Sequence, residues 1–432
     1  MDQWGKRTVI AAVPLTAALG FYLMPFPLPG FYLFGFRLLI CILLFYLLWR
    51  KERIVLNGSR ETGLFFRVGM AWLVWGTLSV VWSSFLWNFQ VRAGLVEIAS
   101  VGAGFLYGMV LLNLVVGVPR GIDALRVGWV LAFIATGMVA LWEIASGNHL
   151  TGYATDNLSI ETAVYSTFVN PNNYAAFLAL CFPFLLWSFR LARGVKRAAF
   201  VLLLVVLPAL MVMTLGRLSL LALAIEYCLF LMLNLKWSSW RGVAIPVFSV
   251  ILMTSVAEYD SILAKVLNVP LEFDSGGSGE IRLNLLRNGL KFLAASYGAG
   301  VGPANYQSAT NVVAFKSLPT EGIASPHNFW IEISSQYGLI IFGAFLWWLG
   351  RLAVCAWRSR REALLKQDLH ARLAAETVLV ALAGYGFAAC ENSSYIAQQI
   401  NWIFLASLLV ICTGLSGRSG SRSNRSEPGG IL

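Results

Sequence analysis

Residues 170–234 read NPNNYAAFLALCFPFLLWSFRLARGVKRAAFVLLLVVLPALMVMTLGRLSLLALAIEYCLFLMLN. Three apolar runs follow one another in this stretch, at residues 170–189, 198–214 and 216–234. Each run is close to the ~20 residues that an α-helix needs to cross the hydrocarbon core of a bilayer. Four basic residues lie between the first two runs, whereas a short turn with one arginine joins the second run to the third. The stretch therefore predicts three membrane-spanning helices of alternating direction.

Comparable apolar runs cover the rest of the chain. They lie at residues 8–28, 31–49, 63–85, 93–116, 124–145, 242–257, 328–350, 373–391 and 395–415. Of the 432 residues, 58% are hydrophobic and only 12% are charged, which is about half the charged share of an average soluble domain. This composition excludes a water-soluble protein. We predict an all-α integral membrane protein with about 12 transmembrane helices, which form a single polytopic membrane domain over residues 1–415.

The distribution of basic residues predicts the topology. With the N-terminus inside, 23 of the 32 Lys and Arg residues fall in the inner segments and seven fall in the outer segments. Basic residues concentrate on the cytoplasmic side of membrane proteins. We therefore expect both termini in the cytoplasm, and we attribute the net charge of +11 to topology rather than to nucleic-acid binding. Residues 416–432, rich in Ser, Gly and Arg, are typical of a disordered cytoplasmic tail.

One outer connection, from about residue 258 to residue 327, is far longer than the others. Connections of this length inside a compact domain are usually functional or disordered. Within it, residues 281–295 combine apolar and basic side chains at helical spacing, which predicts a short amphipathic helix along the membrane interface. We expect the chemistry of the protein at this outer loop.

Three outer arginines are candidate phosphate ligands. Arg217 lies in the short turn between two predicted spans, and Arg282 and Arg287 lie on the predicted loop helix, about 140° apart around its axis. A guanidinium is planar and permanently charged, and its fork of N–H donors matches phosphate oxygens. Each arginine also has a structural interpretation as an anchor that reaches the lipid headgroups. The spacing leaves open which of Arg282 and Arg287 contacts a ligand.

His327 is the candidate general base. It lies where the outer loop re-enters the membrane, and its unperturbed pKa suits proton transfer near neutrality. We interpret the other two histidines, His149 and His370, as solvated residues. Four asparagines near span starts are weaker candidates for binding sugar hydroxyls, and helix capping is the alternative for them. They are Asn170, Asn172, Asn173 and Asn328.

Acidic residues give no clear metal motif. Glu97 and Glu226 fall inside predicted spans, where a carboxylate is a functional candidate, although pairing with an arginine or a backbone donor explains it equally well. No Asp-rich outer motif is visible, and Asp260 and Asp274 are the only outer-loop aspartates that leave a divalent-cation site as an alternative. Residues 298–302, reading GAGVG, lack the strand and helix of a nucleotide-binding fold.

Five segments together resemble a known family. They are, in chain order, FVNPNNYAAF (168–177), TLGRLSLL (214–221), EIRLNLLRNGLKF (280–292), YGAGVGPANY (297–306) and SPHNFWIE (325–332). This order resembles the O-antigen ligase and O-antigen polymerase superfamily over residues 160–340. The spans on either side match only in hydropathy. The resemblance implies a glycosyltransferase of the GT-C type in the bacterial inner membrane.

The resemblance also implies a reaction and a role for each candidate residue. A glycan would pass from an undecaprenyl-diphosphate carrier to an acceptor hydroxyl, with inversion and without a metal ion, nucleotide sugar or other cofactor. Arg217, Arg282 and Arg287 would hold the diphosphate, and His327 would assist the acceptor. We expect a ligase whose acceptor is a lipid core or another anchor. A polymerase that uses a second lipid-linked glycan as acceptor is the alternative.

A transporter or flippase of lipid-linked sugars is the alternative from another class. Transporters often contain inverted repeats and helices broken near the midplane of the membrane. Here no internal repeat is visible, and the polar candidates lie on one face of the membrane, the outer face, where flipped lipid-linked glycans reside. We therefore favour the enzyme, with the donor, the acceptor and membrane lipids as its partners.

Overall fold

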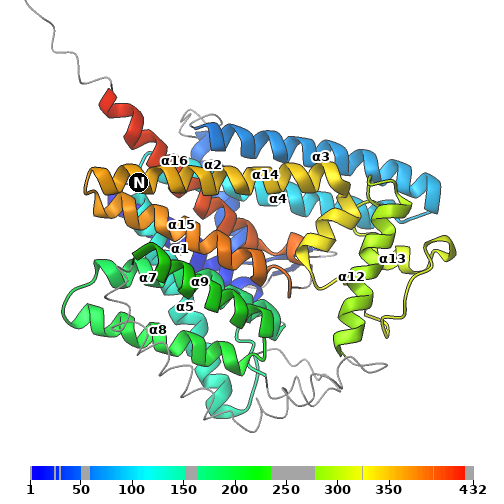
Figure 1. The fold of residues 1–432 in the computed structure, drawn as a ribbon, viewed down its shortest axis with the longest axis horizontal. Coiled ribbons are helices and arrows are strands. Elements are labelled where there is room, and N and C mark those ends of the chain that lie inside the picture. The colour runs from blue at the N-terminus through cyan, green and yellow to red at the C-terminus, as the bar shows by residue number, and fades with distance from the viewer. Residues whose placement is uncertain are drawn as a thin grey trace, which may run out of the picture.

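A computed structural model describes residues 2–23, 26–28, 31–49, 59–150, 163–168, 170–234, 278–323, 325–392 and 394–423. Most of these residues form helices that pack in one bundle (Figure 1). The helices are α1 (Gln3–Leu19), α2 (Gly35–Trp49), α3 (Arg60–Trp87), α4 (Val91–Val116), α5 (Gly121–Ser146), α7 (Pro171–Leu191), α8 (Val195–Met213), α9 (Arg217–Asn234), α12 (Ser278–Ala295), α13 (Tyr306–Thr310), α14 (Phe329–Leu365), α15 (Leu369–Ala388) and α16 (Gln399–Ser423). Shorter elements are the 3-10 helices η1 (Gly20–Tyr22), η3 (Val313–Phe315) and η4 (Tyr395–Ala397) and the strands β1 (Phe26–Leu28) and β2 (Phe31–Leu33).

The helices confirm the predicted fold class, an all-α integral membrane protein. Within the described residues, nine helices are long and apolar enough to cross a membrane, namely α3, α4, α5, α7, α8, α9, α14, α15 and α16. The helix α2 is apolar but has only 15 residues. Eleven of the twelve predicted spans coincide with a described helix. The remaining one, residues 242–257, lies outside the described residues, as does the first part of the long outer loop.

Three predicted boundaries are wrong. The first helix ends at Leu19 rather than at residue 28, because the chain turns at Gly20, with a φ of 53°, and then forms the β1–β2 hairpin. The helix α14 continues to Leu365 instead of ending at residue 350, since the added residues are good helix formers without glycine or proline. The helix α16 continues to Ser423, into the predicted disordered tail, and no proline interrupts it between Gln399 and Ser423.

The helices α7 and α16 form the centre of the bundle. In each of them, 83% of the most apolar 18-residue window is buried, against 17% in α8 at the periphery. A helix that is apolar on all sides belongs in the interior of a large membrane bundle. Their contacts with α5, α15 and α4 fix the positions of the helix ends that carry the candidate residues (Figure 1).

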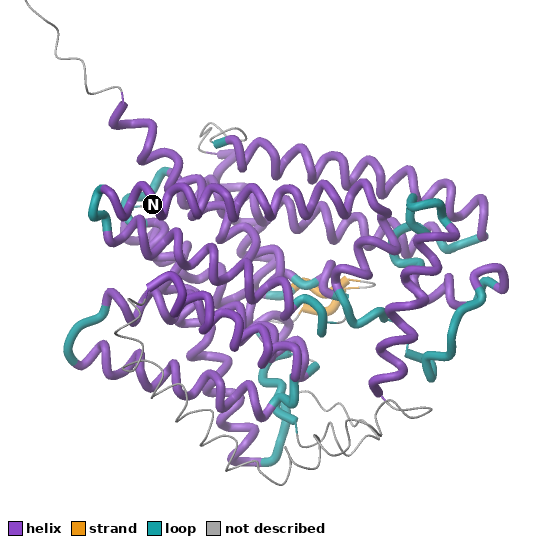
Figure 2. The backbone as a smooth tube through the Cα atoms, in the orientation of Figure 1, coloured by secondary structure: helices purple, strands orange, loops and turns teal. Residues whose placement is uncertain are grey.

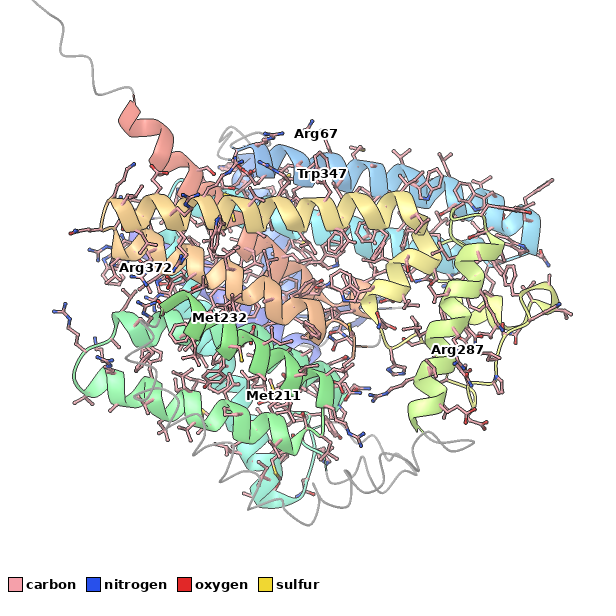
Figure 3. All side chains as sticks on the ribbon, viewed as in Figure 1. Arg67, Met211, Met232, Arg287, Trp347 and Arg372 are labelled. Carbon is pink, nitrogen blue, oxygen red and sulfur yellow. The ribbon has the colours of Figure 1, made fainter. Side chains whose placement is uncertain are left out.

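The bundle has two chemically different ends. At one end, Arg190, Arg360 and Arg372 donate to the buried carboxylate of Glu376 at N–O distances of 2.7, 3.1 and 2.8 Å, and we call this the basic end. The opposite end, where α15 finishes and α14 starts, carries the candidate residues, and we call it the site end. Figure 3 labels Arg372 at the basic end and Arg287 far from it, on α12. This arrangement agrees with the alternation of helix direction that the basic residues predict.

A break in α14 explains the glycine run at residues 298–302. Inside α14, Gly338 has φ 79° and ψ 178°, so the helix is interrupted there (Figure 2). The glycine run pairs with the interrupted backbone through three hydrogen bonds, from Val301 N to Ser335 O (2.8 Å), Gly302 N to Gln336 O (2.9 Å) and Leu339 N to Gly298 O (2.9 Å). We call this pairing of residues 298–302 with residues 335–339 the glycine clamp. It replaces helical hydrogen bonds that the break removes.

The second half of the outer loop has a small core of its own. Its buried apolar side chains include Leu285 and Phe292 of α12, Tyr306 of α13 and Phe315 of η3. The amide of Asn288 exchanges two hydrogen bonds with the backbone of Leu318, at 3.0 and 2.7 Å. The predicted loop helix is therefore confirmed as α12, which runs across the direction of α14 at the site end (Figure 1).

Candidate functional site

Glu391 links the two elements that carry Arg217 and Arg282. It lies just beyond α15, and its side chain is only 1% exposed. Oε2 accepts hydrogen bonds from the backbone N–H and the hydroxyl of Ser219, at 3.1 and 3.0 Å. Oε1 lies 3.9 Å from Nη1 of Arg282. One buried carboxylate therefore connects the N-terminus of α9 with α12.

Arg217 is the first residue of α9, and its side chain is exposed. Its backbone N–H also interacts with the carboxylate of Glu391. A Cβ on the preceding Gly216 would lie 2.7 Å from the Cβ of Ala175, so glycine allows α9 to start close against α7. The first N–H groups of a helix lack intrahelical acceptors, and the helix dipole favours an anion beside them. The start of α9 thus gives its backbone donors to Glu391 and carries the guanidinium of Arg217.

The structure separates Arg282 from Arg287. Arg282 is about half exposed and approaches the Glu391 carboxylate, whereas the exposed Arg287 lies elsewhere on α12 (Figure 3). Within the part of the chain that the structure describes, no ion pair joins Arg287 to an acidic residue. Of the two loop arginines, Arg282 is therefore the one that the fold brings to the start of α9.

His327 lies two residues before α14 in a sparsely populated backbone conformation. Its φ is 46°, which non-glycine residues seldom adopt. Burial lowers the pKa of His327 below its ordinary value of 6.5, and the positive charge of Arg282 lowers this pKa further. A histidine with a lowered pKa is neutral at pH 7, and a neutral imidazole has one nitrogen that accepts a proton. The side chain is therefore suited to act as a general base.

The carboxyl group of Glu391 is affected by the same surroundings. Burial raises the pKa of Glu391, whereas Arg282 and the donors of Ser219 and Arg217 lower it. The group has good donors for its charged form, although it is buried. Arg282 and the N–H donors at the start of α9 contact this one carboxylate, and Arg217 carries a second guanidinium on the same helix start, so positive charge exceeds negative charge here.

Comparison with known proteins gives two results. Residues 202–348 match the model of the family described as O-antigen ligase. The chain is also 24% identical to the teichuronic acid biosynthesis protein TuaE of Bacillus subtilis (strain 168) over 415 residues, which cover 90% of this chain and 80% of that protein. Both matches support the O-antigen ligase and polymerase superfamily. Together with the nine apolar helices of the described residues, they support a multi-pass bacterial membrane enzyme of the O-antigen ligase and polymerase type.

The part that matches the O-antigen ligase family contains Arg217, Arg282, Arg287 and His327, whereas Glu391 lies beyond it. The sequence interpretation missed Glu391 because the predicted span 373–391 placed it at the end of a helix. The observed helix ends at Ala388, and Glu391 follows in a loop. The sequence feature that could have identified Glu391 is the one that singled out Glu97 and Glu226, namely a carboxylate inside an apolar stretch.

Two of the candidate asparagines cap helices. The side chain of Asn170 accepts a hydrogen bond from Asn172 N at 2.8 Å at the start of α7. Asn328 accepts from Trp330 N and Ile331 N, at 3.0 and 3.2 Å, at the start of α14. Capping, the alternative interpretation, therefore describes these two. Oδ1 of Asn173 is buried without a hydrogen-bond partner, and a sugar-binding role for the asparagines stays a prediction.

Other buried carboxylates hold loops near the site end. Glu143 accepts hydrogen bonds from the backbone of Tyr165 and Ser166 at 3.1 and 2.7 Å, and Nδ1 of His149 lies 3.1 Å from its Oε1. The prediction that His149 is merely solvated is therefore wrong, because the ring is largely buried between Glu143 and Tyr165. Glu332 of α14 accepts from Tyr395 N at 3.2 Å and so fixes the segment that follows Glu391.

Glu97, which is partly buried, and Glu226, which is fully buried, do not join the site. Glu97 accepts a hydrogen bond from the Tyr337 hydroxyl at 2.8 Å, and Glu226 packs against Gly384 with neither oxygen hydrogen-bonded. Within the described residues, no group of three His, Cys, Asp or Glu side chains could hold a metal ion. Asp260 and Asp274 lie outside those residues.

Proposed function

We propose that the protein transfers a glycan from an undecaprenyl-diphosphate carrier to an acceptor hydroxyl, with inversion, at the outer face of the bacterial inner membrane. The observation that carries this proposal is the convergence of Arg217, Arg282 and His327, from three separate elements, at one end of the bundle. The 23-to-seven distribution of basic residues favours the outer face for this end, with both termini in the cytoplasm.

Arg217 and Arg282 would bind the diphosphate of the donor. A diphosphate carries several negative oxygens, and guanidinium forks are suited to them. When the bond between the anomeric carbon and the diphosphate breaks, its electron pair stays on the diphosphate oxygen. Donors that are already oriented toward that oxygen stabilise the developing charge without reorganising. Because the arginines supply the positive charge, the proposal needs no metal ion.

His327 would activate the acceptor. Its neutral imidazole takes the proton of the acceptor hydroxyl while the hydroxyl oxygen attacks the anomeric carbon from the side opposite the diphosphate. One bond to the anomeric carbon forms as the other breaks, so the configuration inverts. The products are the glycosylated acceptor and undecaprenyl diphosphate, and His327 then releases its proton to water.

A ligase is the preferred form of this activity. The family match carries the description O-antigen ligase, and the relative TuaE is described as a teichuronic acid biosynthesis protein. Both descriptions concern surface polysaccharides. We propose a lipid core or another envelope anchor as acceptor, and a second lipid-linked glycan, which would define a polymerase, is the alternative outcome.

The test is transfer in vitro by the purified full-length protein in nanodiscs. An undecaprenyl-diphosphate glycan is offered with either a lipid-core acceptor or a lipid-linked acceptor. We expect transfer by the wild type and by Arg92→Ala, a control that removes an exposed arginine at the start of α4. We expect losses of at least 100-fold for His327→Ala, a range typical of a general base, and the acceptor used distinguishes ligase from polymerase. Undiminished transfer by His327→Ala and Arg217→Ala would mean that the active site lies elsewhere.

A further inference from the structure

Glu391 contacts Arg282 and the start of α9, and the proposed reaction assigns it no step. Its carboxylate is buried, divides its two oxygens between α9 and Arg282, and lies outside the segment that matches the O-antigen ligase family. We infer that Glu391 is a positioning residue, which orients Arg282 and the start of α9 toward one diphosphate. This inference rests on the proposed function for the identity of the ligand.

The contacts of Glu391 fix it in place. Ser219 donates twice to Oε2, and a Cβ on Gly216 would already lie 3.2 Å from that oxygen, so little free space surrounds it. A buried carboxylate without donors is strongly unfavourable. The start of α9 supplies these donors, and the position of Glu391 relative to α9 is therefore well determined.

The second oxygen of Glu391 then restricts Arg282. The Arg282 side chain is long and about half exposed, and a free arginine of this kind samples many rotamers. With Oε1 at 3.9 Å, Glu391 favours rotamers in which the guanidinium faces the start of α9. Binding residues whose side chains are oriented in advance lose less entropy when the ligand arrives.

The segment that carries Glu391 is also tied to His327. The backbone N–H of Phe329, two residues after His327, donates to the carbonyl of Ala389, two residues before Glu391, at 2.9 Å. Nδ2 of Asn392 donates to the carbonyl of Ala388 at 2.9 Å. Residues 388–392 thus lie between the proposed base and both proposed diphosphate ligands, and they hold the three groups in one arrangement.

A purely structural role makes a different prediction. If Glu391 only capped α9, Ser219→Ala, which removes one hydrogen bond to the same oxygen, would have effects similar in kind to those of Glu391→Gln. If Glu391 positions Arg282, the negative charge matters, and Glu391→Asp should restore part of what Glu391→Gln loses. Glutamine keeps the size and an oxygen acceptor, so the comparison isolates the charge.

Two readouts that require no glycan transfer test the inference. One is the affinity of the protein in nanodiscs for undecaprenyl diphosphate. The other is the pKa of His327 measured by NMR, which is practicable because the chain has only three histidines. Arg282 of α12 is the charged group that acts on His327, and the Glu391 carboxylate lies 3.9 Å from the Arg282 guanidinium. Loss of the Glu391 charge leaves Arg282 uncompensated, so the pKa of His327 should fall.

We expect Glu391→Gln to weaken the binding of undecaprenyl diphosphate at least tenfold and to lower the pKa of His327. We expect Ser219→Ala to change affinity less than threefold, with the same His327 pKa as the wild type, and Glu391→Asp to lie between the wild type and Glu391→Gln. Wild-type affinity and an unchanged His327 pKa in a folded Glu391→Gln protein would overturn the inference. If the wild type binds the diphosphate but transfers no glycan, the proposed function fails while the affinities still decide the role of Glu391. Absence of diphosphate binding by the wild type would overturn both.

Discussion

Gly300→Ala should destabilise the protein through the glycine clamp. Gly300 has a φ of 86°, and a non-glycine residue in the left-handed region costs about 1–2 kcal/mol. A Cβ there would lie 2.4 Å from the carbonyl oxygen of Gln336, which accepts the clamp hydrogen bond from Gly302. Loss of one to three clamp hydrogen bonds, at about 1 kcal/mol each, adds about 1–3 kcal/mol. We therefore expect the free energy of unfolding to fall by about 2–5 kcal/mol.

Gly322→Ala is the matched control for this prediction. Gly322 also has a positive φ, of 77°, but a Cβ there would have no heavy atom within 4 Å. Its substitution should cost only the backbone term of about 1–2 kcal/mol. Reversible unfolding of both variants in mixed micelles, followed by circular dichroism, measures the difference. Equal destabilisation by the two substitutions would refute the clamp as a source of stability.

Three further predictions concern the site. Arg282→Ala should lower kcat/KM for the donor by about 10- to 100-fold, as expected for loss of a charge-assisted hydrogen bond of about 1.5–3 kcal/mol. Arg287→Ala should lower kcat/KM less. A larger loss for Arg287→Ala than for Arg282→Ala in a transfer assay would make Arg287 the diphosphate ligand. The pKa of His327 is lowered, so kcat/KM should stay high as the pH falls to 6.5 and decline only below that value. Because Arg282 lowers this pKa, Arg282→Gln should shift the decline in kcat/KM to higher pH. A decline at the same pH in both proteins would contradict the electrostatic contact between the two residues. Activity should survive prolonged incubation with EDTA, and restoration of a lost activity by Mg²⁺ or Mn²⁺ would show that a metal ion takes part.

The sequence alone was sufficient to predict the positions of the described membrane helices and the alternation of their directions. Apolar runs of about 20 residues have few structural alternatives, because a membrane helix must satisfy its own backbone. The errors lie at helix ends, where hydropathy carries little information. Polar or amphipathic residues such as those after Arg351 are compatible with either a loop or a continued helix, and the observed helix α14 includes them.

The site was only partly predictable for a related reason. Arginines and a histidine on the outer side are conspicuous in a membrane protein, and they make Arg217, Arg282, Arg287 and His327 candidates without distinguishing Arg282 from Arg287. The choice between Arg282 and Arg287 depends on how α12 is oriented against the bundle, which the small core around Phe292 determines. Glu391 escaped notice because its contacts, with Ser219 and Arg282, span more than 100 residues of sequence and exist only in the folded chain.

The central claim is that His327 is the base of a glycan transfer supported by Arg217 and Arg282. The most direct measurement is single-turnover transfer of a labelled glycan from undecaprenyl diphosphate by the wild type, His327→Ala and Arg92→Ala at pH 7.5, with donor binding measured on the same samples. We predict that His327→Ala binds the donor as the wild type does but transfers at least 100-fold more slowly, the contribution expected of a general base, while Arg92→Ala does both normally. Equal single-turnover rates for the wild type and His327→Ala would contradict the account.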